Sequence, residues 1–225
     1  MSADDPLDGM GLSLRRGASE LHVIRHADAI PESDATHLAY DDYEGHSLSE
    51  RGRAQAEALA ERFAAFDIAA VYASPIARAR ETAAAVANRI GVPVVADPDL
   101  REVEIGAMEG EMSLRQRLHA LATIALRDGS WNGIPGTERS ELVRERMLRS
   151  LDGIAARHPT ERVAVVSHAG AINAALGAIV ETAHDFIFPL ANASISIVRI
   201  NGGRRLLMSA NETAHLSRIP SRAPR

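Results

Sequence analysis

Two apolar runs, far apart in the chain, each lead into a histidine. Residues 21–24 are followed by Arg25 and His26, and residues 163–166 are followed after one serine by His168. Short apolar runs of this kind are typical of buried strands in a parallel sheet. Because open α/β sheets build their sites at the carboxyl ends of strands, the two runs predict a single site assembled from both. The basic side chains at that edge indicate chemistry on an anion such as phosphate.

Strand-like and helix-like patterns alternate between these runs, which predicts βα units around a mainly parallel sheet. We therefore expect an α/β protein, with the sheet as the central layer of a three-layer αβα sandwich. Ser47 and Ser74 are expected to cap two of the helices, and Gly91 to end one. Strands are expected at 21–25, 68–73, 92–96 and 162–167, helices at 47–63, 74–90, 113–127, 138–157 and 171–180, and a hairpin over 194–208.

The chain of 225 residues has the length of one α/β domain. We expect a mobile N-terminal segment over 1–19, a single domain over 20–216 and a mobile tail over 217–225. Within the domain, residues 103–140 are Gly-rich and less regular. They are interpreted as an insertion with one helix that forms a partly helical cap over the site.

Composition excludes several classes of protein. The chain has no cysteine, which excludes disulfides, thiolate metal sites and cysteine nucleophiles. A net charge of −5 without a dense basic run argues against nucleic acid as a partner. No apolar stretch approaches transmembrane length, and residues 1–19 lack the apolar core of a signal peptide, so no membrane association and a cytoplasmic location are expected.

A metal site is not expected, although the chain has nine histidines. His22 and His26 have the spacing of a helical zinc pair, but they lie in a predicted strand. There they would stand about 13 Å apart, too far to share an ion.

The remaining polar residues suit phosphoryl transfer. Arginine offers a planar fork of donors for phosphate, and both Arg25 and Arg78 are placed near predicted strand ends. A neutral imidazole nitrogen is a competent nucleophile for phosphorus, and a second imidazole can stabilise the charged transition state, so the pair His26 and His168 suits this chemistry. Glu102 starts the Gly-rich insertion, where a carboxyl group can protonate the leaving oxygen.

Together these residues resemble the histidine phosphatase superfamily, which includes the cofactor-dependent phosphoglycerate mutases. The pieces that match occur in the family's order between about residues 20 and 200. They are Val-Ile-Arg-His-Ala at 23–27, Leu-Ser-Glu-Arg-Gly at 48–52, Ser-Pro-Ile-Ala-Arg-Ala-Arg-Glu-Thr-Ala at 74–83, Leu-Arg-Glu at 100–102 with Gly106 and Glu-Gly at 109–110, Ser-His-Ala-Gly at 167–170, and Asn-Ala-Ser at 192–194.

The resemblance implies a phosphoglycerate mutase-like fold and a role for each matched residue. His26 would be the nucleophile that becomes phosphorylated. Arg25, Arg78 and His168 would form the phosphate pocket, with His168 also counted as catalytic, and Glu102 would be the proton donor. No metal and no organic cofactor are implied.

Some assignments stay open at this point. Glu104 competes with Glu102 as the proton donor, because alternation in an extended segment would aim both side chains the same way. Asn192 and Glu138 are possible members of the substrate pocket.

The first loop departs from the family's pattern. Ala27 stands where the family usually has glycine, and Glu32 stands where asparagine is common. Ala169 likewise replaces a common glycine. These departures leave the substrate undefined.

The favoured function is a phosphomonoester phosphatase of the histidine acid phosphatase type, acting through a phosphohistidine on a small phosphorylated metabolite. The Leu-Arg-Glu segment and the Glu-Gly pair that follows it resemble phosphatase members more than mutases. The first alternative is a phosphoglycerate-type mutase. The second is a catalytically silent protein that binds a phosphate ligand. The oligomeric state stays open, a homodimer included.

Overall fold

The computed structural model describes residues 7–29, 45–105 and 114–219. Glu32 in the first loop and Gly106, Glu109 and Gly110 in the insertion lie outside these residues. The described part contains one six-stranded sheet in the order β3-β2-β4-β1-β5-β6. Its strands are β1 (Ser19–Arg25), β2 (Ala70–Ala73), β3 (Val94–Ala96), β4 (Arg162–Ser167), β5 (Ile195–Asn201) and β6 (Arg204–Glu212).

The first four strands of that order run parallel, and β5 and β6 are antiparallel additions at one edge. This confirms the predicted mainly parallel sheet and its C-terminal hairpin. The pairing of β1 with β4 sets Arg25 opposite Ser167. The next residue continues the ladder, since the backbone N–H of His26 donates to the Ser167 carbonyl at 2.9 Å. His26 and His168 therefore leave neighbouring strands at the same edge of the sheet.

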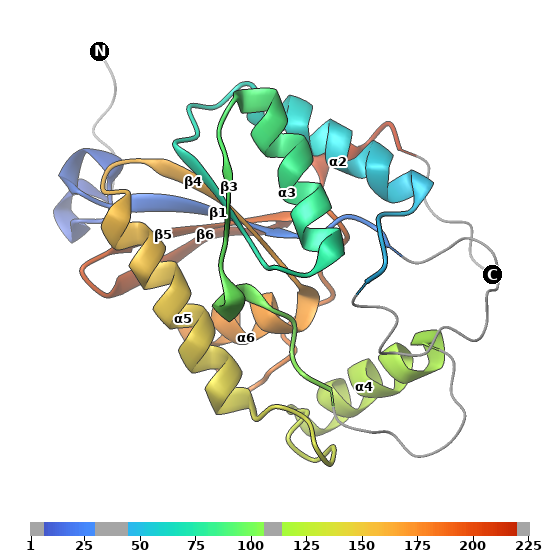
Figure 1. Cartoon of the computed structure of the whole chain (residues 1–225). Coiled ribbons are helices and arrows are strands. Elements are labelled where there is room, and N and C mark those ends of the chain that lie inside the picture. Colours follow the sequence, from blue (N-terminus) through green and yellow to red (C-terminus); the bar gives the residue numbers. More distant parts are fainter. Residues whose placement is uncertain (1–6, 30–44, 106–113, 220–225) are drawn as a thin grey trace.

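Helices cover both faces of the sheet, as Figure 1 shows. On one face lie α2 (Glu50–Phe63) and α3 (Ala77–Ile90), and on the other α5 (Ser140–Arg157) and α6 (Ala169–Ile179). The cap helix α4 (Leu114–Asp128) stands apart from both layers in this view. The described part also has four short 3₁₀ turns, namely η1 (Asp8–Met10), η2 (Leu14–Arg16), η3 (Pro98–Leu100) and η4 (Ala214–Leu216).

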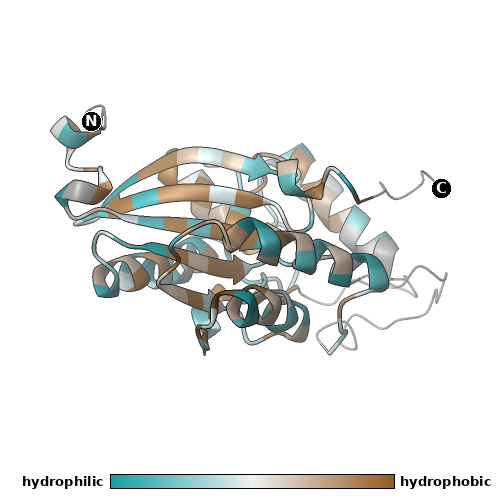
Figure 2. Cartoon of the chain, turned by 90° about the horizontal axis from the view of Figure 1, so that it is seen from above, coloured by the Kyte–Doolittle hydropathy of each residue, from teal (hydrophilic) through white to brown (hydrophobic). Residues whose placement is uncertain are grey.

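The central strands are apolar because both of their faces are buried. In β1, Leu21 and Val23 pack in the cluster that contains the α5 and α6 side chains, while Ile24 packs with Leu59 and Phe63 of α2. Figure 2 shows the same distribution, with mostly hydrophobic strands between helices of mixed character. The runs met in the sequence thus reflect burial on two sides.

Two predicted helix caps are wrong. The α2 helix begins at Glu50, and its cap is Ser49 rather than Ser47, with the Ser49 hydroxyl accepting from the Gly52 N–H at 3.0 Å. The first loop holds Ser49 in this position, since the Ser49 N–H and hydroxyl donate to the Asp28 carbonyl at 2.9 and 3.1 Å. Ser74 is not the cap of α3, whose N-cap is Ile76. Gly91 ends α3 with a positive φ of 76°, as predicted.

The buried face of α5 also differs by one position from the prediction. Leu148 was expected there with Leu151 and Ile154, but Leu148 is only half-buried and Met147 is fully buried instead. Met147 packs in the same hydrophobic cluster as Leu21 and Val23 of β1, so the buried face of α5 includes position 147 in place of position 148.

The described part of the segment before β1, residues 7–18, packs on the domain. Leu12 and Ser13 are buried, and the Asn201 side chain donates to the Gly11 carbonyl at 2.7 Å. The turn between β5 and β6 therefore holds residues 7–18 against the sheet. Across the described ranges, no helix combines the length and the apolar character that crossing a bilayer requires.

Candidate active site

His26 lies at the end of β1 with its ring 3% exposed and its tautomer defined by two neighbours. The ring Nδ1 is 2.7 Å from the Ala27 carbonyl oxygen, which only accepts, so Nδ1 carries the proton. The Arg78 Nε–H, which only donates, points at Nε2 over 3.2 Å. Both contacts require a neutral imidazole whose lone pair is on Nε2, directed at the arginine.

Arg78 lies in the first turn of α3, as predicted, and is 2% exposed. Thr82, one turn later, donates its hydroxyl to the Arg78 carbonyl at 2.7 Å and accepts from the Ala27 N–H at 3.0 Å. This one hydroxyl ties the helix that carries Arg78 to the loop that carries His26. Arg25 reaches the same cavity and is held by the Leu190 carbonyl, to which its Nη1 donates.

His168 follows β4 and is fully buried beside His26, with the two ring centroids 5.0 Å apart. Its Nε2 lies 2.8 Å from the Ser74 hydroxyl. Its Nδ1 is buried and has no hydrogen-bond partner among the residues the structure describes. A buried polar atom in that state is costly. His168 itself is absent from the described residues that line the cavity beside His26, so its place in the phosphate pocket stays a prediction.

Glu102 sits against the start of α6, where its carboxylate caps the helix. Oε1 accepts from the N–H groups of Ala171 and Val103, both at 2.9 Å, and Oε2 accepts from Gly170 at 3.3 Å. A carboxylate complements the positive end of a helix dipole. The side chain is thereby fixed while it still lines the cavity that contains His26.

The structure separates the two candidate proton donors. Glu104 is exposed and is absent from the described residues that line the cavity. Its backbone is instead joined to Glu138, through the Glu138 N–H to its carbonyl at 2.8 Å.

Neither of the two possible pocket residues lines the cavity, judged on the residues described. The Glu138 carboxylate is bound to the Arg146 guanidinium at 2.8 and 2.9 Å. Asn192 donates to the His26 carbonyl at 3.2 Å and lines a separate hollow that shares Arg25. Asn192 thus contacts the backbone of His26, whereas Glu138 is part of the support behind Glu102.

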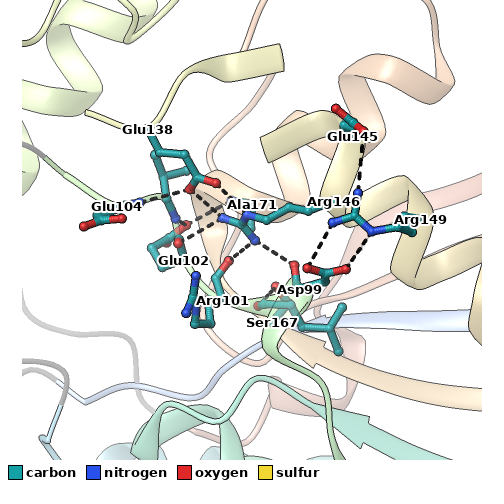
Figure 3. A network of polar contacts seen from close by, with 12 residues as sticks. Asp99, Arg101, Glu102, Glu104, Glu138, Glu145, Arg146, Arg149, Ser167 and Ala171 are labelled. Carbon is teal, nitrogen blue, oxygen red and sulfur yellow. Dashed lines mark hydrogen bonds and ion pairs between the residues drawn. The ribbon is translucent and has the colours of Figure 1, made fainter. Parts of the chain in front are cut away.

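That support is the Arg146 network in Figure 3. From α5, Arg146 donates to the carbonyls of Asp99, Arg101 and Glu102 at 2.7, 2.7 and 3.1 Å. It is 6% exposed, and Glu138 balances its charge. One side chain therefore fixes the backbone that carries Glu102.

The site opens into a cavity of about 240 Å³. Its polar end consists of Arg25, His26, Arg78 and Glu102, which the sequence predicted to come together. The cap contributes to its wall through Leu121, Ala122 and Ala125 of α4 and through Trp131.

Burial and charge keep both histidines neutral. Burial lowers the pKa of His26 well below its usual value, and the positive charges of Arg78 and Arg25 lower it further. Burial likewise lowers the pKa of His168, with contributions from His26, Arg78 and Arg25. A neutral His26 is the form that carries a nucleophilic lone pair.

Comparison with known proteins defines the family. The model of the histidine phosphatase superfamily (branch 1) matches residues 21–213 of this chain. The chain belongs to that superfamily. Its fold agrees, since the solved structure of Bacillus stearothermophilus YhfR superimposes with a TM-score of 0.73 at 25% identity, over 88% of this chain and 99% of that one.

Curated relatives of this superfamily member include proteins named as phosphatases and proteins named as mutases. It is 29% identical to "Metal-independent phosphoserine phosphatase" of Arabidopsis thaliana, over 76% of this chain and 74% of the relative. It is 31% identical to "Probable phosphoglycerate mutase GpmB" of Erwinia tasmaniensis, over 72% of this chain and 74% of that relative. Similarity therefore defines the superfamily without separating phosphatase from mutase.

Three supporting residues of this histidine phosphatase chain escaped prediction. Ser74 and Thr82 both fall inside a matched motif, but their patterns indicated a helix cap and an apolar helix face. Arg146 falls in no motif, and nothing in its sequence surroundings marks it. Within residues 7–29, 45–105 and 114–219, no three His, Asp or Glu side chains gather as they would around a metal ion.

Proposed function

We propose that this protein is a phosphomonoester phosphatase that works through a phosphohistidine at His26. The observation that carries the proposal is the His26 tautomer, whose Nε2 carries the lone pair at a cavity lined by Arg25, Arg78 and Glu102 and accepts from the Arg78 Nε–H. A bound phosphoryl oxygen would take over this Arg78 donor and free Nε2 to attack. A phosphate monoester matches this polar end in charge, and its phosphorus would lie within reach of Nε2.

In the first step, Nε2 of His26 forms a bond to phosphorus while the bond to the ester oxygen breaks. Glu102 gives its proton to that oxygen, so an alcohol leaves. Of its two carboxyl oxygens, Oε2 has only the long 3.3 Å contact with Gly170, which makes it the better proton carrier. Oε1, with two shorter contacts, holds the group in place.

In the second step, the Glu102 carboxylate takes a proton from water, and the hydroxide oxygen attacks phosphorus. The N–P bond breaks, inorganic phosphate leaves and His26 returns to its neutral form. The same carboxyl group acts as acid and then as base, so each turnover restores the starting state.

Arg25, Arg78 and His168 would stabilise the charge on the phosphoryl oxygens. The arginines supply fixed positive charge, and the His168 Nδ1 would gain its missing partner in a phosphoryl oxygen. Donors that are already in place when charge develops are the most effective kind of transition-state stabilisation.

A phosphoglycerate-type mutase is the second candidate, favoured by the 31% identity to a relative named as a probable mutase. The two activities differ in the fate of the phosphohistidine. Incubation with 3-phosphoglycerate separates them, because free phosphate indicates a phosphatase and 2-phosphoglycerate indicates a mutase. A silent binding protein would form neither product and no phosphohistidine.

The His26→Ala variant tests the mechanism directly. We expect it to lower kcat for p-nitrophenyl phosphate by at least about a thousandfold, since the nucleophile is lost. The acid-labile phosphoenzyme seen after rapid quenching should disappear as well. His119→Ala removes an exposed histidine and serves as the matched control. Turnover that survives in a folded His26→Ala protein would refute the assignment.

A further inference from the structure

Away from its polar end, the cavity is lined by apolar side chains among the residues described. The described lining residues other than Arg25, His26, Arg78 and Glu102 have no ionisable group, and we call them the apolar half. They are Val103, Ile105, Leu121, Ala122, Ala125, Trp131, Ala169, Gly170, Phe186, Pro189 and Leu190.

Several polar atoms of these residues are already engaged within the protein. The indole N–H of Trp131 donates to the Glu138 carbonyl at 3.0 Å. The Pro189 carbonyl accepts from Asn211 at 3.1 Å, and the Leu190 carbonyl accepts from Arg25. The N–H groups of Val103 and Gly170 go to Glu102. A ligand in the apolar half therefore contacts mainly hydrocarbon side chains, and few hydrogen-bond donors or acceptors of the described lining residues are left to bind it.

This wall disfavours a substrate with a second charge. Phosphoserine and 3-phosphoglycerate carry a carboxylate near the phosphate, and a buried carboxylate needs a cation or several donors. The cations that line the described cavity, Arg25 and Arg78, both belong to the polar end with the phosphate. A carboxylate in the apolar half would lose its hydration, and none of the described residues lining that half offers a charge to replace it.

We infer that the substrate is a phosphate monoester of a small apolar alcohol, with a single ring or a short branched chain as its organic group. This rests on the proposed phosphatase function and narrows it. The cavity of about 240 Å³ is below the usual range for drug-sized ligands, so a small group fits. Burial of that group in the apolar half supplies the binding free energy that a carboxylate would not.

A set of esters of primary alcohols tests the inference, because their P–O bonds are similar in reactivity. We expect kcat/KM for 2-phenylethyl phosphate and 3-methylbutyl phosphate to exceed that for phosphoserine and 3-phosphoglycerate by at least about tenfold. Equal or faster hydrolysis of the carboxylate esters would overturn it.

Charge placed in the apolar half should reverse this preference. Leu121→Arg puts a cation on the α4 wall, and we expect it to lower kcat/KM for 2-phenylethyl phosphate and raise it for 3-phosphoglycerate. Leu126→Arg makes the same change on the same helix at a side chain that is 59% exposed, and it should alter neither value. A Leu121→Arg protein with an unchanged preference would contradict the inference.

These experiments distinguish failure of the substrate inference from failure of the proposed phosphatase function. Hydrolysis of p-nitrophenyl phosphate that depends on His26, combined with a preference for carboxylate esters, refutes only the apolar substrate. Absence of any phosphate release and of any phosphohistidine refutes the phosphatase itself.

Discussion

Gly170 couples the backbone of α6 to Glu102, the proposed proton donor. Its N–H contacts Glu102 Oε2 at 3.3 Å, and a Cβ at this position would lie 2.8 Å from Oε1 and 2.9 Å from the Val103 side chain. The carboxylate thus occupies the space that a side chain on residue 170 would take. At the residue scale, the absence of one methyl group allows Glu102 to approach the helix end.

We therefore expect Gly170→Ala to displace the Glu102 carboxylate. kcat for alkyl phosphates should fall about 10- to 100-fold, since a small misplacement of a reacting group has effects of that size. p-Nitrophenyl phosphate should lose less, because its leaving group needs little protonation. Gly153→Ala is the matched control in α5, where the new Cβ has room and the activity should be unchanged. Equal losses for both substrate classes in Gly170→Ala would argue against a role through Glu102.

At the scale of elements, α5 acts on the site without touching the substrate cavity. Arg146 reaches from this helix to the three carbonyls around Glu102, and Glu138 at the end of the cap segment balances its charge. We regard Arg146 as a positioning residue. Its loss would leave buried carbonyls and the Glu138 carboxylate without their donor, which costs several kcal/mol in comparable sites.

Arg146→Met should therefore lower both stability and proton donation. Below its unfolding temperature, we expect the ratio of kcat for 2-phenylethyl phosphate to kcat for p-nitrophenyl phosphate to drop about tenfold. This ratio does not depend on the folded fraction, so it separates positioning from simple unfolding. Arg149→Met is the matched control, three residues further along α5. Arg149 forms an exposed ion pair with Asp99, so this variant should leave the ratio and the stability nearly unchanged. An unaltered ratio in Arg146→Met would assign the residue a purely structural role.

At the scale of the whole molecule, the site is a source of acid sensitivity. His26 and His168 are buried and neutral, whereas in the unfolded chain each binds a proton near pH 6.5. The unfolded state therefore holds more protons just below that pH. The contribution of these two neutral histidines to the free energy of unfolding is fully present above pH 6.5. It is lost as the pH falls from 6.5 toward their lowered folded-state pKa values.

We expect the free energy of unfolding, from urea titrations, to decrease between pH 6.5 and 5.5 by up to about 1 kcal/mol for each of these histidines. Inorganic phosphate should reduce the loss, because an anion in the polar end favours the protonated rings. His168→Gln should flatten the pH dependence, and His119→Gln at an exposed position should not.

A separate loss at lower pH serves as an internal check. The hydrogen bond from His22 lowers the pKa of Glu20 to about 2, from 4.5 in the unfolded chain. The stability from this carboxylate is present above pH 4.5 and declines only below it. A decrease confined to pH values under 4.5 would contradict the contribution of the buried histidines.

The sequence by itself determined the strands, their ends and the four residues of the polar end, because each of these is encoded in a short local pattern. An apolar run that stops at Arg25-His26 encodes burial and a strand end together, and Arg78 and Glu102 follow their own short motifs. Only the tertiary structure places Glu102, and not Glu104, among the described residues that line the cavity, since the Glu102 carboxylate is held by the distant N–H groups of Ala171 and Gly170. It also moved Glu138 out of the pocket, through its pairing with Arg146.

The apolar half of the cavity was likewise beyond the sequence. Its wall comes from α4, the Trp131 turn and residues 186–190, which are ordinary hydrophobic residues in their own segments. Whether such a side chain fills the core or lines a cavity depends on what packs opposite it, and no local pattern records that. Short motifs specify the polar end, because each position there requires one type of side chain. The shape of the apolar half depends on packing, because many different hydrophobic side chains can fill the same positions.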